Sequence, residues 1–289
     1  MRSLHDLPAP AKLNLFLHVL GRRSDGYHLL QSAFMLLDWC DLLHVECRAS
    51  ARLSREDLGS TALPEDDLCL RAARALQQAS GCTKGAHITL EKRLPTQAGL
   101  GGGSSDAATT LLALNRLWQL DLPRSTLARI ALALGADVPF FILGQNAWAE
   151  GVGEALTPLP PQAVQAGTRF VVVKPAAGLE TARIFSDPSL RRDTQAATIA
   201  GFVAEQARSA FGFGRNDLQP VAQRLCPEVA QALHWLASRG LSGRMTGSGS
   251  AVFAVTKDTI DVSDAPAHWS IKVCQNLGFH PLAEWVRDE

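Results

Sequence analysis

The sequence lacks the cysteine and histidine patterns that mark several classes of protein. Its six cysteines form no C-x-x-C pair, and its eight histidines form neither an H-E-x-x-H motif nor a tight cluster with cysteine. A structural zinc site or a metalloprotease centre is therefore not indicated. A chain of 289 residues can be held by its core without disulfides, so we expect reduced thiols and a cytoplasmic location.

The formal net charge is zero, because 28 lysines and arginines balance 28 aspartates and glutamates. No overall field would draw the protein onto nucleic acid or an anionic membrane, so any phosphate site must be local. The first eight residues lack the apolar segment of a secretory signal, and the most apolar stretch, 130–143, is interrupted by Asp137 and Pro139. We expect no export, no membrane segment and no nucleic-acid partner. Monomer and homodimer both stay open.

The length predicts roughly two domains. A hydrophobic fraction of 46% with 19% charged residues is ordinary for a globular chain and excludes a disordered or collagen-like protein. The proline-rich segment 157–162 has no apolar period, which is typical of an extended connection. We therefore predict one domain over residues 1–160 and a second over residues 161–289.

Hydrophobic periods predict both strands and helices. In segment 12–19 apolar residues alternate with others, as in a strand, which places Lys12 and Asn14 on one face. Further strands are predicted over 87–92, 170–173 and 251–255. Helical spacing predicts helices over 68–79, 124–134, 196–210 and 218–236, where Pro220 and Pro227 set the start of the last helix or kink it.

The strongest local signal is a glycine-rich loop between the strand at 87–92 and an apolar helical pattern. Four of the five residues from Gly99 to Gly103 are glycine, so successive backbone N–H groups can form a nest for an anion. We expect Ser104, Ser105 or Asp106 to cap the following helix, whose start favours phosphate. The loop matches neither G-x-x-x-x-G-K-[ST] nor G-x-G-x-x-G, and a flexible turn with close helix–strand packing is the alternative.

Two charged residues are candidates for chemistry on a phosphoryl group. Such a transfer needs a positive group near the moving charge and a carboxylate that orients or deprotonates the attacking hydroxyl. Lys12 and Asp137 could supply these groups. The alternatives are a lysine whose amine reaches solvent and an aspartate that caps the next segment.

Five blocks, taken in order, carry a resemblance to a known family. Residues 95–108, with the core Gly-Leu-Gly-Gly-Gly-Ser-Ser, resemble the phosphate-binding motif of the GHMP kinases (galactose, homoserine, mevalonate and phosphomevalonate kinases). The other blocks are 11–15, 23–28, 135–141 and 246–250, and all five together resemble the members of that family that act on a cytidine-diphosphate-linked methylerythritol. The similarity spans nearly the whole chain.

The resemblance implies a fold and an activity. The fold is the two-domain α+β fold of GHMP kinases, with an N-terminal domain like the second domain of ribosomal protein S5 and a C-terminal ferredoxin-like domain. The activity is transfer of the ATP γ-phosphate to a hydroxyl of the methylerythritol unit, on the non-mevalonate route to isoprenoid precursors. Magnesium is implied because it neutralises the β- and γ-phosphates.

The resemblance also implies roles for residues of the small-molecule site. Asp137 matches the catalytic base, Lys12 the lysine that stabilises developing charge, and Asn14 a substrate-positioning residue. Tyr27 and His28 match the block that recognises cytosine by packing and hydrogen bonding, and Phe185 would stack on the base from the opposite side. The alternatives are a core or surface aromatic for Tyr27, a loop histidine with satisfied hydrogen bonds for His28, and core packing for Phe185.

For ATP, the resemblance implies contacts by the glycine loop and its flanks, namely Lys92, Pro95, Gly99, Leu100, Gly101, Gly102, Gly103, Ser104 and Ser105. A second glycine turn with Gly247, Ser248 and Gly249 would form another nest, or else a plain turn before a strand. One departure concerns Asp67, which stands where the family often has asparagine, and an ionised aspartate cannot donate a hydrogen bond to adenine. The magnesium ligands stay unassigned, with Ser105 a candidate.

Two other functions stay in view. Another GHMP kinase, acting on mevalonate, homoserine or a sugar, would share the loop but has no need of Tyr27 and His28. A nucleotide-binding regulator without catalysis would need neither Lys12 nor Asp137.

Overall fold

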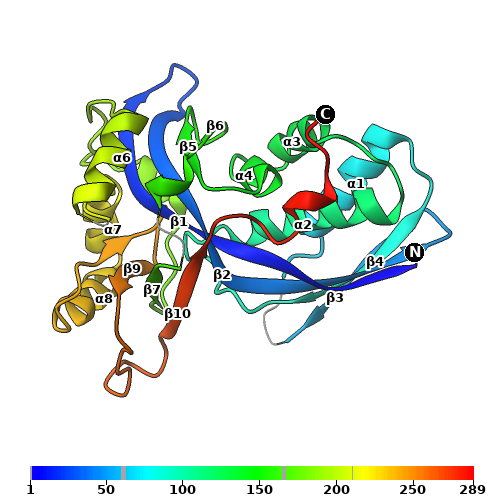
Figure 1. Cartoon of the computed structure of the whole chain (residues 1–289). Helices are drawn as coiled ribbons and strands as arrows, with labels where there is room; N and C mark the ends of the chain where they lie inside the picture. Colours follow the sequence, from blue (N-terminus) through cyan, green and yellow to red (C-terminus); the bar gives the residue numbers. More distant parts are fainter. Residues whose placement is uncertain (1, 60–62, 165–166, 210) are drawn as a thin grey trace.

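Two long strands organise the molecule. The computed structural model describes residues 2–59, 63–164, 167–209 and 211–289. Strands β1 (Ser3–Arg22) and β2 (His28–Arg48) pair antiparallel and run through both lobes of the molecule (Figure 1). A turn at residues 23–27 joins them, and Gly26 in this turn has a φ of 92°, which suits glycine. Each lobe is built on one part of this ribbon.

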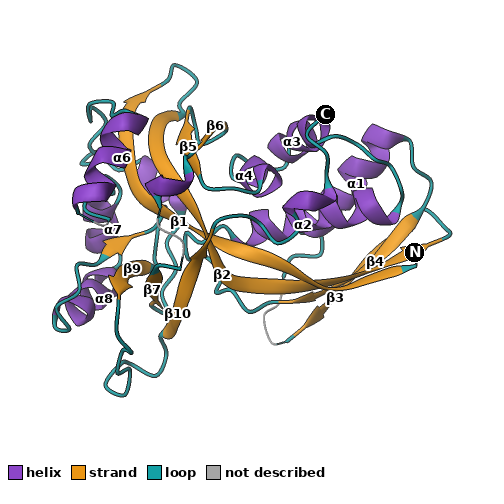
Figure 2. Ribbon diagram, viewed as in Figure 1, coloured by secondary structure: helices purple, strands orange, loops and turns teal. Residues whose placement is uncertain are grey.

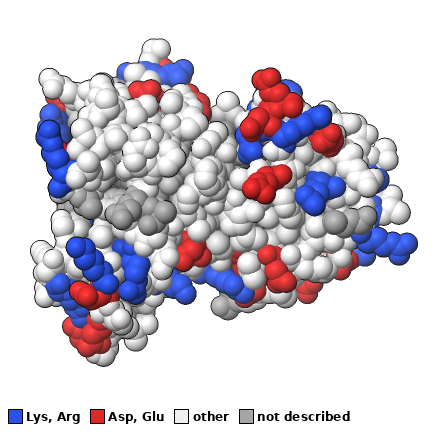
Figure 3. All heavy atoms as spheres, in the orientation of Figure 1, with Lys and Arg blue, Asp and Glu red and all other residues white. Residues whose placement is uncertain are grey.

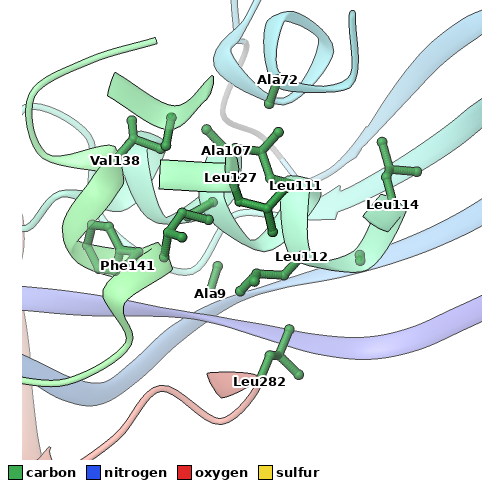
Figure 4. Close-up of a cluster of buried hydrophobic side chains, with 14 of the residues drawn as sticks. Ala9, Ala72, Ala107, Leu111, Leu112, Leu114, Leu127, Val138, Phe141 and Leu282 are labelled. Atoms are coloured by element: carbon green, nitrogen blue, oxygen red, sulfur yellow. The ribbon is translucent and has the colours of Figure 1, made fainter. Parts of the chain in front are cut away.

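The first lobe covers one face of the sheet with helices (Figure 2). Strand β4 (Gly85–Glu91) pairs with β2, and β3 (Leu53–Leu58) pairs in parallel with β4. The helices are α1 (Leu68–Ser80), α2 (Gly102–Leu117), α3 (Arg124–Leu132) and α4 (Val138–Leu143). Leu111 and Leu114 of α2 join a core with Val138 and Phe141 of α4 (Figure 4). The helices predicted over 68–79 and 124–134 are confirmed.

The second lobe has its own antiparallel strands and flanking helices. Strand β7 (Arg169–Lys174) lies between β10 (Ser270–Leu277) and β9 (Val252–Thr256), and β9 also pairs with β8 (Arg244–Met245). Asn276 and Leu277 of β10 pair with β2, which joins the lobes in one sheet. Helices α6 (Ile199–Arg208), α7 (Gln219–Leu225) and α8 (Pro227–Ala237) flank these strands (Figure 1), and the short α5 (Thr181–Phe185) follows β7 in the chain.

The segment predicted as one helix over 218–236 is two helices. Pro220 lies in the first turn of α7, and Pro227 starts α8 after the extended Cys226. Proline has no N–H to donate and disfavours a helical residue before it, so the chain breaks at Cys226 instead of kinking.

Part of the proline-rich segment 157–162, predicted as an extended connection, is a paired strand. Thr157 and Pro158 belong to β6 (Ala155–Pro158), which pairs with β5 (Ala147–Glu150), and a 3-10 turn over Pro161–Ala163 follows. Pro158 is tolerated because it ends an edge strand. A division at residue 160 stays a prediction. Leu17 and Val19 pack in the core of the second lobe, whereas Leu282 and Val286 pack in the core of the first.

Two further observations concern the distribution of charge on the surface and the hydropathy of the helices. Acidic and basic side chains are interspersed over the face shown in Figure 3. Among the described residues, no helix is long and apolar enough to cross a membrane.

The C-terminal segment returns to the first lobe and holds helix α4. The guanidinium of Arg124 donates to the carbonyls of Ile142 at 2.6 Å, Ala283 at 2.8 Å and Val286 at 3.1 Å. Ile142 lies in the last turn of α4, where carbonyls have no helical partner and a positive charge is favourable. The backbone N–H of His280 donates to Gly144 O at 2.7 Å, directly after the helix. Arg124 therefore ties the end of α4 to residues 280–288.

We predict that Arg124→Met destabilises the protein by about 2–4 kcal/mol, because buried carbonyls lose their donor. Arg129→Met on the same helix is the control, since Arg129 is exposed and forms no hydrogen bond or ion pair with a described residue. Urea unfolding followed by fluorescence measures both variants. Equal stabilities for the two variants would contradict this role of Arg124.

Candidate active site

Strand β1 buries a lysine at the junction of the lobes. Lys12 is 3% exposed, so its amine does not reach solvent along the surface. The Nζ atom donates to Asn14 Oδ1 at 2.5 Å and lies 3.5 Å from Asp137 Oδ2. It also lies 5.1 Å from the centroid of the Phe34 ring, a distance at which a cation is attracted to the ring face. The buried charge is thus surrounded by groups that compensate it.

Asp137 occupies the residue before helix α4 and turns its carboxylate toward Lys12. Although it stands at the N-cap position, its side chain makes no capping hydrogen bond in the described structure. The side chain of Asp137 is 36% exposed, so one oxygen can face a ligand while the other faces Lys12. The structure therefore brings together two charged groups that are 125 positions apart in the sequence.

Asn14 links this pair to the second glycine turn. Its amide Nδ2 donates to Ser32 Oγ at 2.9 Å, which leaves Oδ1 free to accept from Lys12. The backbone N–H of Asn14 donates to Thr246 Oγ1 at 2.9 Å, and Thr246 Oγ1 lies 3.3 Å from Gly99 O. Thr246 thus connects the central strand with both glycine turns.

The phosphate-type loop differs from the prediction in how its helix begins. Helix α2 starts at Gly102, with Gly101 as a left-handed N-cap at φ 72° and no side-chain cap. The expected caps Ser104, Ser105 and Asp106 are therefore wrong. Because no side chain covers the helix end, the N–H groups of its first turn stay free for a ligand. This is the local geometry of an anion site.

Three adjoining cavities surround these groups. The central cavity, about 650 Å³, is lined by Lys12, Asn14, Asp137, Gly99, Gly101 and the turn Gly247, Ser248 and Gly249. A second, about 530 Å³, is lined by Tyr27, His28 and Phe185, and it shares Phe185, Thr181 and Val152 with the first. A third, about 510 Å³, follows the loop past Lys92, Pro95, Leu100, Gly102, Gly103 and Ser104, and it shares Gly99 and Gly101 with the central cavity.

The second cavity collects the three predicted aromatic residues. Tyr27 is 64% exposed, so it is not a core residue. His28 is buried and stacks on Phe185, with ring centroids 4.9 Å apart and an angle of 29° between the rings. Burial lowers the pKa of His28, and the positive charges of Arg192 and Arg22 lower it further. The imidazole is therefore neutral at neutral pH.

Lys92, a predicted nucleotide contact, and Asp67, the departure from the family's asparagine, both have partners within the protein. The ammonium of Lys92 donates to Asp106 Oδ2 at 2.7 Å and to Asp41, beneath the glycine loop. Burial alone lowers the Lys92 pKa, but the charges of Asp106 and Asp41 outweigh this and raise it, while burial raises the pKa of Asp106. Asp67 caps α1 by accepting from Leu70 N at 3.1 Å and pairs with Arg55.

Several residues of the site carried no sequence signal. Thr246 was predicted only as part of a turn. Asp41 accepts from the N–H groups of Arg93 and Leu94 at 2.6 and 2.7 Å, which fixes the entry to the loop, yet it lies in an unremarkable strand. Arg192 binds His28 from a segment without regular structure. An aspartate within the apolar run of β2 is the one signal that could have indicated Asp41.

Family comparisons agree with this geometry. The model described as "GHMP kinases N terminal domain" matches residues 67–145, and "GHMP kinases C terminal" matches residues 194–273. A crystal structure of homoserine kinase from Cytophaga hutchinsonii shares the fold, with a TM-score of 0.71 at 15% identity over 97% of this chain and 96% of that one. The predicted two-domain α+β GHMP kinase fold is confirmed.

Relatives with higher sequence identity identify the family within the GHMP kinases to which the chain belongs. The 4-diphosphocytidyl-2-C-methyl-D-erythritol kinase of Delftia acidovorans is 64% identical over 100% of this chain and 99% of its own, and that of Paracidovorax citrulli is 63% identical over the whole of both. A crystal structure of 4-(cytidine 5'-diphospho)-2C-methyl-D-erythritol kinase has a TM-score of 0.79 at 34% identity, covering 93% of this chain and 99% of that one. The chain belongs to the 4-diphosphocytidyl-2-C-methyl-D-erythritol kinase family of the GHMP kinases.

Gly99→Ala tests the contact between the two glycine turns. A Cβ at Gly99 would lie 2.3 Å from Thr246 O, and the φ of 72° strains any other residue. We expect a loss of about 1–3 kcal/mol in unfolding free energy together with weaker nucleotide binding. Gly103→Ala is the control, because its Cβ would meet only Leu68 Cδ1 at 3.5 Å, and alanine favours a helix. Equilibrium unfolding that ranks Gly103→Ala as the less stable variant would reject the close contact.

Proposed function

We propose that the protein transfers the γ-phosphate of ATP to a hydroxyl of 4-diphosphocytidyl-2-C-methyl-D-erythritol, on the non-mevalonate route to isoprenoid precursors. The observation that carries the proposal is the 3.5 Å approach of Lys12 Nζ to Asp137 Oδ2, in the cavity that adjoins the other two. The proposal is also supported by the relatives at 64% and 63% identity, which are named as kinases of this substrate.

In this proposal Asp137 acts on the attacking hydroxyl. Its carboxylate accepts the hydroxyl proton as the substrate oxygen bonds to the γ-phosphorus, and the bond from that phosphorus to the β,γ-bridging oxygen breaks in line. Lys12 stabilises the negative charge on the transferring group, and its buried position makes that interaction stronger than in water. Asn14 holds the Lys12 ammonium and positions the substrate.

ATP binds along the third cavity, with its phosphates at the start of α2. The free N–H groups of the first helical turn and the glycine-rich backbone are suited to phosphate oxygens. The turn Gly247, Ser248 and Gly249 lies against Gly99 of this loop and lines the central cavity, where it can approach the transferred phosphate or the substrate diphosphate.

The residues present fit a magnesium ion with few protein ligands. Ser105 Oγ and Asp106 Oδ1 are buried without a hydrogen-bond partner, and among the described residues no group of three or more His, Cys, Asp or Glu is placed to hold a metal ion by itself. Such a site suits an ion that takes most of its ligands from phosphates and water. Ser105 would hold the ion, which supplies charge neutralisation to the β- and γ-phosphates.

The cytidine end of the substrate occupies the second cavity. Tyr27 and Phe185 provide flat faces against which the base can stack, and the ring of His28 provides a hydrogen-bonding edge. This cavity separates the proposal from other GHMP kinases, whose substrates have no base to stack.

The first test removes the proposed base. Asp137→Asn keeps the size of the side chain but cannot accept a proton, so we expect kcat to fall about 10²–10⁴-fold with little change in the KM of either substrate. Glu284→Gln, an exposed carboxylate without a partner among the described residues, should keep full activity. A near-normal kcat in Asp137→Asn would reject the role of Asp137.

The second test compares acceptors. Incubation with Mg-ATP and the cytidine-diphosphate substrate, mevalonate or homoserine, followed by phosphorus NMR, should give a new monoester only with the first. Tyr27→Ala should raise the KM of that substrate about tenfold and leave the KM of ATP unchanged, because base stacking is lost. Phe279→Ala is the matched control, since Phe279 is equally exposed at 64%. Monoester formation from mevalonate alone would replace the substrate assignment.

A further inference from the structure

His28 has one ring nitrogen engaged by the protein and one left open. Its Nε2 atom lies 3.0 Å from Nε of Arg192. Its Nδ1 atom makes no hydrogen bond with any described residue, and it is not among the buried atoms that lack a partner. Because the ring lines the second cavity, Nδ1 is accessible from that cavity.

Arg192 is held in place by neutral acceptors. Its Nη1 atom donates to Leu190 O at 3.0 Å, and its Nη2 atom donates to Phe185 O at 3.0 Å and Asp187 O at 2.8 Å. These bonds fix the guanidinium on the turn that follows α5. Arg192 is not one of the residues that line the three cavities, so it stands behind His28 and Phe185.

This contact determines which nitrogen of His28 carries the proton. A guanidinium only donates hydrogen bonds and stays charged, so Nε2 of His28 must accept with its lone pair. A neutral imidazole has one proton, which must then reside on Nδ1. The His28 pKa is lowered by burial first and by Arg192 second, which keeps the ring from taking up a second proton.

We propose that Arg192 is a positioning residue that fixes His28 as an Nδ1–H donor, so that the second cavity selects a base with an acceptor at N3 and rejects one with N3–H. Cytosine has a lone pair at N3, whereas uracil has an N–H there. With uracil bound, the Nδ1–H of His28 would face the N3–H of the base, and neither donor would have an acceptor. Unpaired buried polar groups of this kind give strong discrimination between ligands of similar shape. The inference rests on the proposed cytidine site and deepens it by naming how the base is chosen.

The proton position can be measured without turnover. In protein labelled with ¹⁵N-histidine, long-range ¹H–¹⁵N spectra distinguish the two neutral tautomers, and His28→Gln identifies the His28 signals among the eight histidines. We expect a protonated Nδ1 and an unprotonated Nε2 at pH 7.5. An Nε2–H tautomer, or a doubly protonated ring, would overturn the inference even if every Arg192 variant failed to fold.

The second measurement concerns base choice. The wild type should favour the cytidine-diphosphate substrate over its uridine analogue in kcat/KM, and Arg192→Met should reduce that ratio roughly tenfold, mainly through the KM of the acceptor, with the KM of ATP unchanged. Arg191→Met is the control, because Arg191 is half exposed and pairs only with Asp193 among the described residues.

The outcomes separate this inference from the proposed function. If the wild type does not phosphorylate the cytidine-diphosphate substrate, the proposed function fails. If it does, but the ratio is the same in Arg192→Met and in the wild type, the function stands and the role of Arg192 is rejected. An equal loss with both bases would show that Arg192 only supports the fold of the turn after α5.

Discussion

An ammonium group buried in the middle of a strand must be compensated, and this constraint shapes the whole junction of the lobes. The Lys12 ammonium donates to Asn14 on its own strand and pairs with Asp137 at the start of α4. Its backbone N–H donates to Leu100 O at 2.9 Å, which ties the glycine loop to the same residue. Asn14 is then held by Ser32 and Thr246, so the second glycine turn is drawn to the first. One buried charge thus sets the positions of a strand, a helix and two loops.

The parts of the site that could be predicted from the sequence are those with local signals. Alternation in β1 correctly placed Lys12 and Asn14 on one face, and both line the central cavity. The glycine loop was predicted because its composition and its place between a strand and a helix reflect short-range physics. The convergence of Lys12 and Asp137 followed only from the resemblance, since neither residue alone distinguishes a reactive group from an ordinary one.

The rest could not be predicted because it depends on contacts distant in sequence or on backbone irregularity. Strict alternation puts Phe16 beside Asn14, but β1 has a register shift between Asn14 and Leu17, and Phe16 packs in the core with Leu13 instead. Gly101 replaced the expected side-chain caps because its left-handed conformation starts the helix earlier. Arg192 meets His28 across 164 positions, and nothing in the local pattern of either residue indicates that contact.

The contacts also divide the chemistry from the choice of substrate. Asp137 and the glycine loop belong to the first lobe, Lys12 lies at its junction with the second, and α4 is tied down by Arg124 and the returning C-terminal segment. The base cavity, in contrast, is built mainly on the second lobe, where the turn before β2 carries Tyr27 and His28 and α5 carries Phe185 (Figure 1), while Ala136 comes from the segment before α4. A small displacement of the lobes would therefore move Ala136 and Asp137 relative to the base cavity, while His28 stayed stacked on Phe185. The alignment of the base cavity with Asp137 is therefore the part of the site that depends on how the two lobes are joined.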